Sequence, residues 1–372
     1  MLYHPAPRTA KPRVVITTTG HRIDRDMKIW LLAGCLLFCT MKVSAQDTDT
    51  DSTHAGYVPV LTGGIGYIEN INGGTPTLEP AIVPLALIPL GSHVLGEARS
   101  EFVGAFQRRN GNGDYTGQVF SDLDYAQIDW LANTHAIVVA GKYITPFGVY
   151  DERFEPIWIA TFQDTPLTYG IGTRTTGFSV GGQVRGVVTQ TDHYSVQYAA
   201  YYSAHSNASQ FQSARTTGFD TSIYLPTHRL EIGTSYQRFL DSKQINSQAA
   251  YFSWQPTQLP LNLKGEYDHS YYGQGYWLEA AYMLSQVPVA NSFFKNVELA
   301  GRMEQAYPLH GGGNGVPRVS TRRPGVALNY YLRDNWRIIS SYQRQFTSTK
   351  DVNIWNVGFT YRFVWPAWPG RK

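Results

Sequence analysis

Two short motifs carry residue types that hydrolytic enzymes use. The segment Gly177-Phe178-Ser179-Val180-Gly181 has the spacing of a nucleophile elbow, and His310-Gly311-Gly312-Gly313 has the pattern of an oxyanion loop. An elbow places its serine between a strand and a helix, downstream of the oxyanion loop. Here the serine lies within an alternating strand pattern and the His-Gly run follows it. The sequence therefore predicts no nucleophilic serine.

Asp268-His269-Ser270 contains the three residue types of a catalytic triad. Neighbours in a strand point to opposite faces, so His269 would point away from Asp268 and Ser270. Triad roles need the three side chains to converge in space. The ten histidines are scattered, and no His, Cys or Asp spacing indicates a structural metal site. We predict no catalytic residues, no metal site and no cofactor.

One long connection, residues 148–173, holds the charged side chains that we expect to act. About 25 residues without a regular pattern make an unusually long loop, and such loops are functional or disordered. Phe154, Trp158 and Phe162 favour a folded loop. Its charged residues, the candidate constriction, are Asp151, Glu152, Arg153, Glu155 and Asp164.

Sixteen segments with strand-like alternation, bounded by turn-forming residues, follow one another from Tyr57 onward. They are residues 57–69, 77–90, 93–107, 114–131, 134–147, 174–190, 193–204, 214–225, 228–240, 243–255, 260–271, 274–286, 296–307, 321–333, 335–346 and 351–363. In 260–271, Leu261 and Leu263 alternate with polar residues such as Lys264. Strands with one apolar and one charged face belong to a half-buried soluble sheet, or to a barrel with lipid outside and water inside. Sixteen in sequence, without helix patterns between them, favour the barrel.

The predicted fold is all-β: a closed antiparallel transmembrane β-barrel of about 16 strands, with a long third outer loop folded into the lumen. Every second connection except Val287–Lys295 is short, as periplasmic turns are. The other set contains most of the long ones, including 148–173, although its connections near Asp241, Gly273 and Thr347 are short too. The 148–173 loop is expected to narrow an aqueous pore. Aromatic residues at strand ends would form two interfacial girdles. The candidates are Tyr271, Tyr272, Tyr276, Trp277, Trp336 and Trp355.

Residues 1–45 are interpreted as upstream sequence followed by a signal peptide. Met27-Lys28 precedes an apolar run and then Val43-Ser44-Ala45, which predicts export and cleavage after Ala45. Leu32-Ala33-Gly34-Cys35 also matches a lipoprotein box, but the apolar run continues past its cysteine. The remaining predicted parts are a polar periplasmic leader at 46–56, the barrel at 57–363 and a short C-terminal tail at 364–372.

Removal of that segment changes the composition. Both cysteines, Cys35 and Cys39, lie within it, so neither disulfides nor thiol chemistry are expected. Seven of the 31 Lys and Arg residues and two of the 28 Asp and Glu residues precede Gln46, leaving 24 basic residues against 26 acidic ones. The formal charge of +3 therefore does not indicate nucleic acid binding, and no basic stripe supports it.

The last strand pattern, Asn356 to Phe363, alternates and ends in Phe. This resembles the signal that the outer-membrane barrel assembly machinery reads. Together with the signal peptide it predicts a place in the outer membrane of a Gram-negative type cell. Outer-membrane lipid and the assembly machinery are the expected partners.

The segment Gly141-Lys142-Tyr143-Ile144-Thr145-Pro146-Phe147-Gly148, followed by Tyr150-Asp151-Glu152-Arg153-Phe154, resembles a recurring segment of the phosphate-selective porin O and P family. The resemblance implies a sixteen-stranded barrel that forms a homotrimer. Phosphate selectivity in that family implies a ladder of arginines and a lysine cluster along the pore. This sequence has no matching run, so anion selectivity is not carried over.

Charged residues assigned to the inward parity are the candidate pore lining. They are Glu97, Arg99, Glu101, Lys142, Arg185, Arg229, Glu231, Lys264, Glu266, Arg302, Glu304 and Arg337. Acidic and basic residues are interleaved, which favours neither anions nor cations. The sequence predicts an outer-membrane porin for passive diffusion of small hydrophilic solutes or ions, and no enzyme. The alternatives are a barrel enzyme, such as a protease or lipase, and a structural or adhesive barrel with a blocked lumen.

Overall fold

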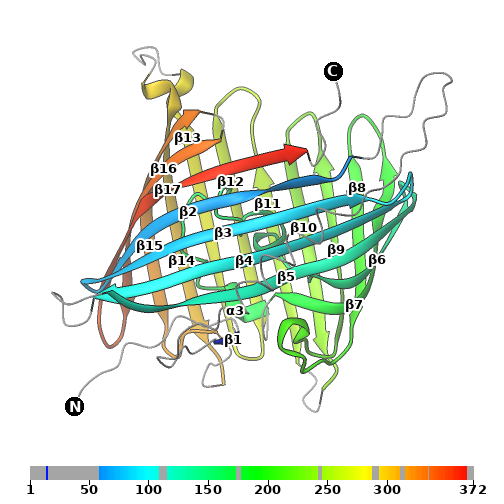
Figure 1. Cartoon of the computed structure of the whole chain (residues 1–372), viewed down its shortest axis with the longest axis horizontal. Coiled ribbons are helices and arrows are strands. Elements are labelled where there is room, and N and C mark those ends of the chain that lie inside the picture. The colour runs from blue at the N-terminus through cyan, green and yellow to red at the C-terminus, as the bar shows by residue number, and fades with distance from the viewer. Residues whose placement is uncertain are drawn as a thin grey trace, which may run out of the picture.

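The structure is a computed structural model that describes residues 14–15, 58–108, 115–172, 177–241, 245–286, 293–310, 315–333 and 335–366. Sixteen strands, β2 to β17, form a closed antiparallel ring in which each pairs with the next and β17 pairs with β2 (Figure 1). The predicted sixteen-stranded barrel is confirmed. A two-residue strand, β1 (Val14–Val15), pairs with β5 beside the ring. The predicted signal cleavage site, the leader at 46–56 and the glycines of the His-Gly run lie outside the described residues.

The strand bounds follow the predicted segments closely. The strands are β2 (Val60–Asn72), β3 (Thr75–Pro89), β4 (Val94–Arg108), β5 (Tyr115–Asn133), β6 (Ala136–Ile144), β7 (Phe178–Gln190), β8 (Ser195–Ser203), β9 (Thr216–Leu225), β10 (Leu230–Phe239), β11 (Asn246–Trp254), β12 (Leu261–Ser270), β13 (Gly273–Met283), β14 (Val297–Pro308), β15 (Thr321–Arg333), β16 (Trp336–Thr347) and β17 (Val352–Pro366). β17 extends three residues past Phe363, so part of the predicted tail pairs with β2.

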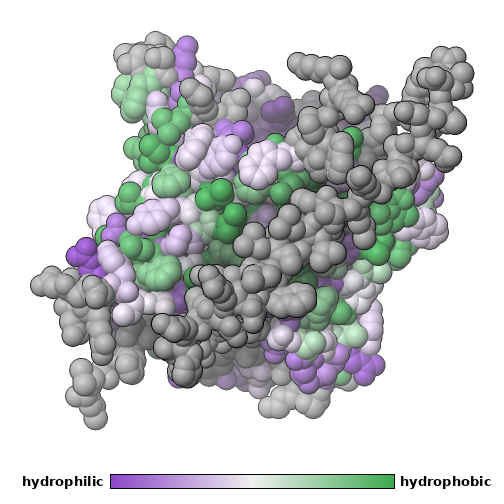
Figure 2. Space-filling view, in the orientation of Figure 1, coloured by the Kyte–Doolittle hydropathy of each residue, from purple (hydrophilic) through white to green (hydrophobic). Residues whose placement is uncertain are grey.

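Side chains alternate between an apolar outer face and a polar inner face. On β5, Ile128 and Trp130 are each 53% exposed, while Asp129 between them is 3% exposed. A soluble barrel would bury its apolar side chains, so this inverted arrangement suits a wall surrounded by hydrocarbon. On the face in Figure 2, hydrophobic residues form much of the visible wall and hydrophilic residues gather toward its lower right rim.

Helical segments are short and lie in the connections. They are α2 (Tyr150–Arg153), α3 (Tyr169–Gly172), η2 (Ser209–Phe211), η3 (Leu284–Gln286) and η4 (Phe294–Asn296). Within the described ranges, no helix is long and apolar enough to cross a membrane.

Strand β6 corrects one part of the sequence interpretation. Val139 and Tyr143 face the interior, where both are buried and pack with Tyr201 of β8. Lys142 follows the opposite parity, but its side chain is only 3% exposed and its ammonium lies 3.7 Å from the Asp122 carboxylate of β5. β5 extends past the end of β6, and the Lys142 ammonium donates to the Leu123 carbonyl on that free edge. The physical reason is the departure of the chain from the wall after Ile144, which leaves β5 polar groups to be satisfied.

The neck of the 148–173 loop is held by two contacts between its two ends. The Thr145 N–H donates to the Gly177 carbonyl at 2.8 Å, and the Thr145 and Ser179 hydroxyl oxygens are 2.8 Å apart. Ser179 is therefore a buried wall residue of β7, a strand that pairs with β6 and β8 in the ring. This is the strand context that the sequence predicted in place of a nucleophile elbow.

Candidate functional site

The connection from β6 to β7, here called the inward loop (residues 145–177, described except 173–176), lies inside the ring. Its residues contact inner-face side chains of strands on the opposite side, far away in sequence. Trp158 packs over Gly64 of β2, where a Cβ would be 2.3 Å from the indole ring. The Ile157 carbonyl accepts a hydrogen bond of 2.8 Å from Arg337 of β16. The loop therefore crosses the lumen and lies against the far wall.

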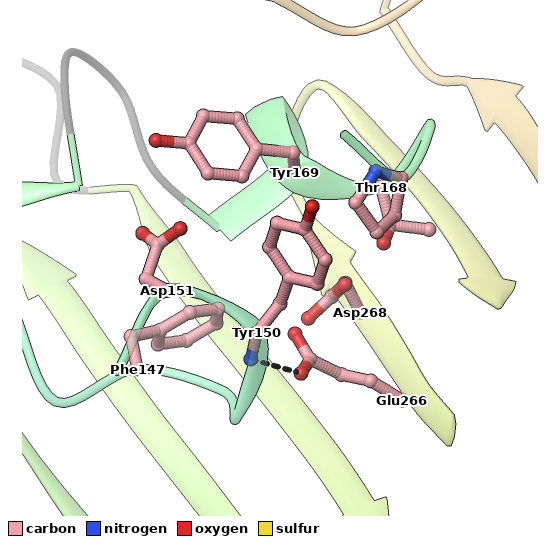
Figure 3. Close-up of a pocket in the computed structure, with 8 residues that line it drawn as sticks. Phe147, Tyr150, Asp151, Thr168, Tyr169, Glu266 and Asp268 are labelled. Carbon is pink, nitrogen blue, oxygen red and sulfur yellow. Dashed lines mark hydrogen bonds between the residues drawn. The ribbon is translucent and has the colours of Figure 1, made fainter. Parts of the chain in front are cut away.

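A carboxylate of the wall fixes the start of α2. Glu266 of β12 accepts a hydrogen bond of 2.7 Å from the Val149 N–H group. It also accepts one of 3.2 Å from the Tyr150 N–H group, which Figure 3 shows. Asp268 lies beside Glu266 on the same inner face, and both line a small pocket with Tyr150 and Thr168. Carboxylates suit this position because the first N–H groups of a helix have no partner within the helix. We call the Glu266 contact the loop latch.

Aromatic packing reinforces the latch. Tyr150 lies edge-on to Trp277 of β13, with ring centroids 5.9 Å apart, and Phe154 contacts the same indole at 6.4 Å. The Lys264 ammonium sits 4.0 Å from the Phe154 ring centroid. Trp277 is only 1% exposed, so the prediction that it belongs to an interfacial girdle is corrected. Its strand position faces inward, and the inward loop covers it.

The second half of the loop rests on a buried ion-pair network. Arg302 of β14 stacks 4.5 Å from the Phe162 ring centroid, and its guanidinium donates to the Asp164 carbonyl at 2.8 Å. The Asp164 carboxylate accepts a hydrogen bond from Asn356 of β17. The ion pairs between strand side chains under the loop are Lys264–Glu279 at 2.9 Å, Arg302–Glu304 at 2.7 Å and Arg323–Glu304 at 2.9 Å.

The five predicted constriction residues do not all present charge to the lumen. Asp151 and Asp164 are buried, because the loop holds them against the wall and its own chain. Glu155 accepts from Arg99 of β4 at 2.9 Å, and Arg153 forms a two-point ion pair with Glu231 of β10, one contact at 2.8 Å. Of the five, Glu152 alone is classed as exposed.

The pKa of Glu152 is raised to about 6, mainly because the surrounding protein removes water from its carboxylate and secondly because the Asp220 carboxylate repels its negative charge. Three other charged groups, Arg153, Arg185 and Glu231, also act on it. Its charge is therefore lost as the pH falls through about 6, well above the ordinary range for a glutamate.

The predicted pore-lining residues divide into three groups. Those covered by the inward loop or buried in the network under it are Arg99, Glu231, Lys264, Glu266, Arg302, Glu304 and Arg337. Partly exposed on the inner face are Glu97, Glu101 and Arg185. The remaining two lie elsewhere: Lys142 is buried against β5, as described above, and Arg229 is exposed in the turn before β10 with a φ of 48°. Alternation cannot say where a strand gives way to a turn, which is why Arg229 was misplaced.

Sequence reasoning missed several inner-face residues that build the site. Asp129 of β5 pairs with Arg185 at 2.6 Å, and Asp220 of β9 accepts from Ser235 at 2.6 Å and from Tyr251 at 3.0 Å. Glu279 and Arg323 belong to the buried network. All of these lie on the inner parity of their strands, so strict alternation would have found them.

The triad-like letters on β12 do not converge. Asp268 and Ser270 are buried on the inner face, while His269 is exposed on the outer face. Among the residues described, no group of three or more His, Cys, Asp or Glu side chains is arranged to hold a metal ion.

Comparison with known proteins gives a fold and no family. No protein-family model matches the chain, and neither does any curated protein. Solved structures of similar fold include OmpF of Salmonella typhi in complex with daunomycin, with 13% identity, 82% of this chain and 98% of that chain covered, and a TM-score of 0.56. In-vitro folded OmpT of Vibrio cholerae has 10% identity, covers 86% and 100%, and has a TM-score of 0.54. The low-pH structure of OprB of Pseudomonas putida has 10% identity, covers 82% and 93%, and has a TM-score of 0.53.

The fold and these similarities define a class: the chain has the sixteen-stranded closed barrel of outer-membrane proteins. Within that class, the site is a lumen divided by an inward loop. One side of the loop is fixed to the far wall, and its other side carries Glu152 and Arg153.

Proposed function

We propose that this chain is an outer-membrane porin through which small hydrophilic solutes or ions diffuse passively. The observation that carries the proposal is the loop latched across the interior of a ring whose outer face is apolar and inner face polar. A ring of sixteen strands encloses an aqueous channel unless its lumen is filled. The similarity in fold to OmpT, an outer membrane protein of Vibrio cholerae, supports the same membrane setting.

The inward loop acts as the constriction in this proposal. It fills the side of the lumen next to β12–β17, and the permeant passes on the other side, past Glu152 and Arg153. Selectivity then comes from size and from the charges exposed there. The chain acts without a cofactor and without catalysis.

The proposal also covers how the chain assembles and how it is exported. The Gly141–Gly148 segment, with its resemblance to the phosphate-selective O and P porins, supports a homotrimer in the outer membrane. A trimer form is also among the solved structures of Vibrio cholerae OmpT. Export by the predicted signal peptide, with cleavage after Ala45, belongs to the same proposal.

Refolded protein in planar lipid bilayers is expected to produce discrete single-channel steps. Insertion of a barrel whose lumen is blocked would give no conductance steps, because ions could not cross it. This outcome would favour the blocked structural barrel, for which the many buried inner-face side chains are the supporting observation. A control with heat-denatured protein separates channels from membrane damage.

Conductance in dilute KCl is expected to fall as the pH is lowered from about 7 to 5. Because the pKa of Glu152 is raised to about 6, protonation in this interval removes the exposed negative charge of the loop. One neutralised charge at a constriction should reduce K⁺ conductance by roughly a factor of two. Single-channel recording across the pH series measures it. The Glu152→Gln variant, which has no proton to gain, should show a flatter profile, and an unchanged profile would exclude Glu152 as the titrating group.

A further inference from the structure

Most basic side chains of the inner wall next to the inward loop are withdrawn from the lumen. Lys264 and Arg302 are buried in ion pairs with Glu279 and Glu304, and Arg323 pairs with the same Glu304. Arg337 donates to the Ile157 carbonyl of the inward loop. A permeating ion cannot approach these groups closely, because the loop lies over them.

Arg99 is withdrawn in the same way. It lies between two carboxylates, with its Nε 2.8 Å from Asp124 and its Nη2 2.9 Å from Glu155. The covered wall carries no excess of positive charge either. Its five cations are Arg99, Lys264, Arg302, Arg323 and Arg337, and they lie among Asp124, Glu155, Asp164, Glu266, Asp268, Glu279 and Glu304.

A different group of charges borders the open side of the inward loop. Glu152 is within electrostatic range of Asp220, Arg153, Arg185 and Glu231. Arg185 in turn pairs with Asp129, and Glu97 lies within range of both. These contacts join the loop to β4, β5 and β7 on one side and to β9 and β10 on the other. The group holds five carboxylates, Glu97, Asp129, Glu152, Asp220 and Glu231, and two guanidinium groups, Arg153 and Arg185.

Both guanidinium groups are already neutralised within this group. Arg153 is paired with Glu231, and Arg185 with Asp129. Among the described residues, Glu97, Glu152 and Asp220 take part in no ion pair, although Asp220 accepts two hydrogen bonds. Within this group of described residues, a formal charge of −3 therefore remains unpaired.

Resting on the proposed porin function, we propose that this lumen selects cations over anions, with Glu97, Glu152 and Asp220 setting the sign. Charge of one sign between low-dielectric walls focuses the field and raises the local concentration of counter-ions. The effect reaches about 10 Å at 0.1 M salt, so it acts where the loop narrows the passage. Small inorganic cations and cationic organic solutes are the class that this passage admits preferentially. The selectivity is opposite to that implied by the phosphate-selective resemblance.

The test is the reversal potential of the refolded protein in a planar bilayer with a tenfold KCl gradient at low ionic strength and pH 7.5. We expect the permeability ratio of K⁺ to Cl⁻ to be about three or more. Glu97→Gln combined with Glu152→Gln should lower the ratio about twofold, and Arg185→Gln should raise it. Asp192→Asn, in the exposed turn between β7 and β8, removes one carboxylate outside the lumen and should change nothing.

The outcomes are distinguishable. A conducting barrel that prefers Cl⁻, or a ratio that the double variant leaves unchanged, overturns the cation selectivity and leaves the porin function standing. A barrel that folds, as judged by its heat-modifiable gel mobility, but does not conduct overturns the proposed function and the selectivity together. Opposite shifts in the double variant and in Arg185→Gln support the proposal even if one of the variants folds poorly.

Discussion

Replacing Arg302 with methionine is expected to lower the free energy of unfolding by about 1–3 kcal/mol, because buried groups beside it lose one of their partners. The guanidinium is buried beside Glu304, at 2.7 Å, and Glu279, at 3.9 Å. Methionine keeps much of the side-chain volume but removes one of the two cations beside each carboxylate, since Lys264 still pairs with Glu279 and Arg323 with Glu304. The cost comes from the buried hydrogen bonds and ion-pair contacts that Arg302 no longer makes.

The same substitution detaches the inward loop from the wall. Arg302 donates to the Asp164 carbonyl and stacks on Phe162, so both contacts of the loop are lost with the charge. Urea titration of the protein folded in lipid vesicles measures the stability change. The matched control is Arg344→Met, which breaks the Arg344–Asp351 pair, 50% and 42% exposed, and should cost about 0–1 kcal/mol. Equal effects of the two variants would mean that the network under the loop adds nothing to stability.

The strands of the ring were predictable because hydrocarbon outside and polar groups inside impose a strict period of two. The segments 321–333 and 335–346 match β15 and β16 to within a residue. It was harder to predict which face of a strand points into the lumen where both faces carry apolar residues. On β6, Lys142 was assigned to the inward parity, yet Val139 and Tyr143 of the other parity are buried inside with Tyr201. Apolar residues are stable on the inner face of a strand where neighbouring side chains shield that face from water.

The sequence predicted that a folded inward loop exists, but not which wall residues it contacts. Its length and its aromatic residues indicated a folded loop, but the latch joins Val149 to Glu266, which are 117 residues apart. Only closure of the ring decides which wall faces the loop. For the same reason the sequence could not separate Lys264 and Arg302, which the loop covers, from Glu97 and Arg185, which it leaves accessible.

Replacing Gly148 with alanine is expected to open the loop latch and to increase single-channel conductance. The residue has a φ of +68°, and a Cβ there would lie 2.2 Å from the Glu266 Oε1 atom. The Glu266 carboxylate must then move, and the Val149 and Tyr150 N–H groups lose their acceptor inside the barrel. Backbone strain costs about 1–2 kcal/mol, and each buried group left without a partner costs about 1–3 kcal/mol more.

A control variant, Gly74→Ala, separates the effect of losing the loop latch from the effect of backbone strain. Gly74, in the turn between β2 and β3, also has a positive φ, +87°, but nothing lies within 4 Å of a Cβ built there. Gly74→Ala therefore carries a comparable strain and leaves Glu266 undisturbed. Hydrogen exchange of the peptides covering residues 145–172, together with single-channel recording, should show faster exchange and larger steps only for Gly148→Ala. If both variants keep the exchange rates and conductance of the parent, the loop is held by Arg302, Trp277 and the far wall rather than by Glu266, and the constriction does not depend on the latch.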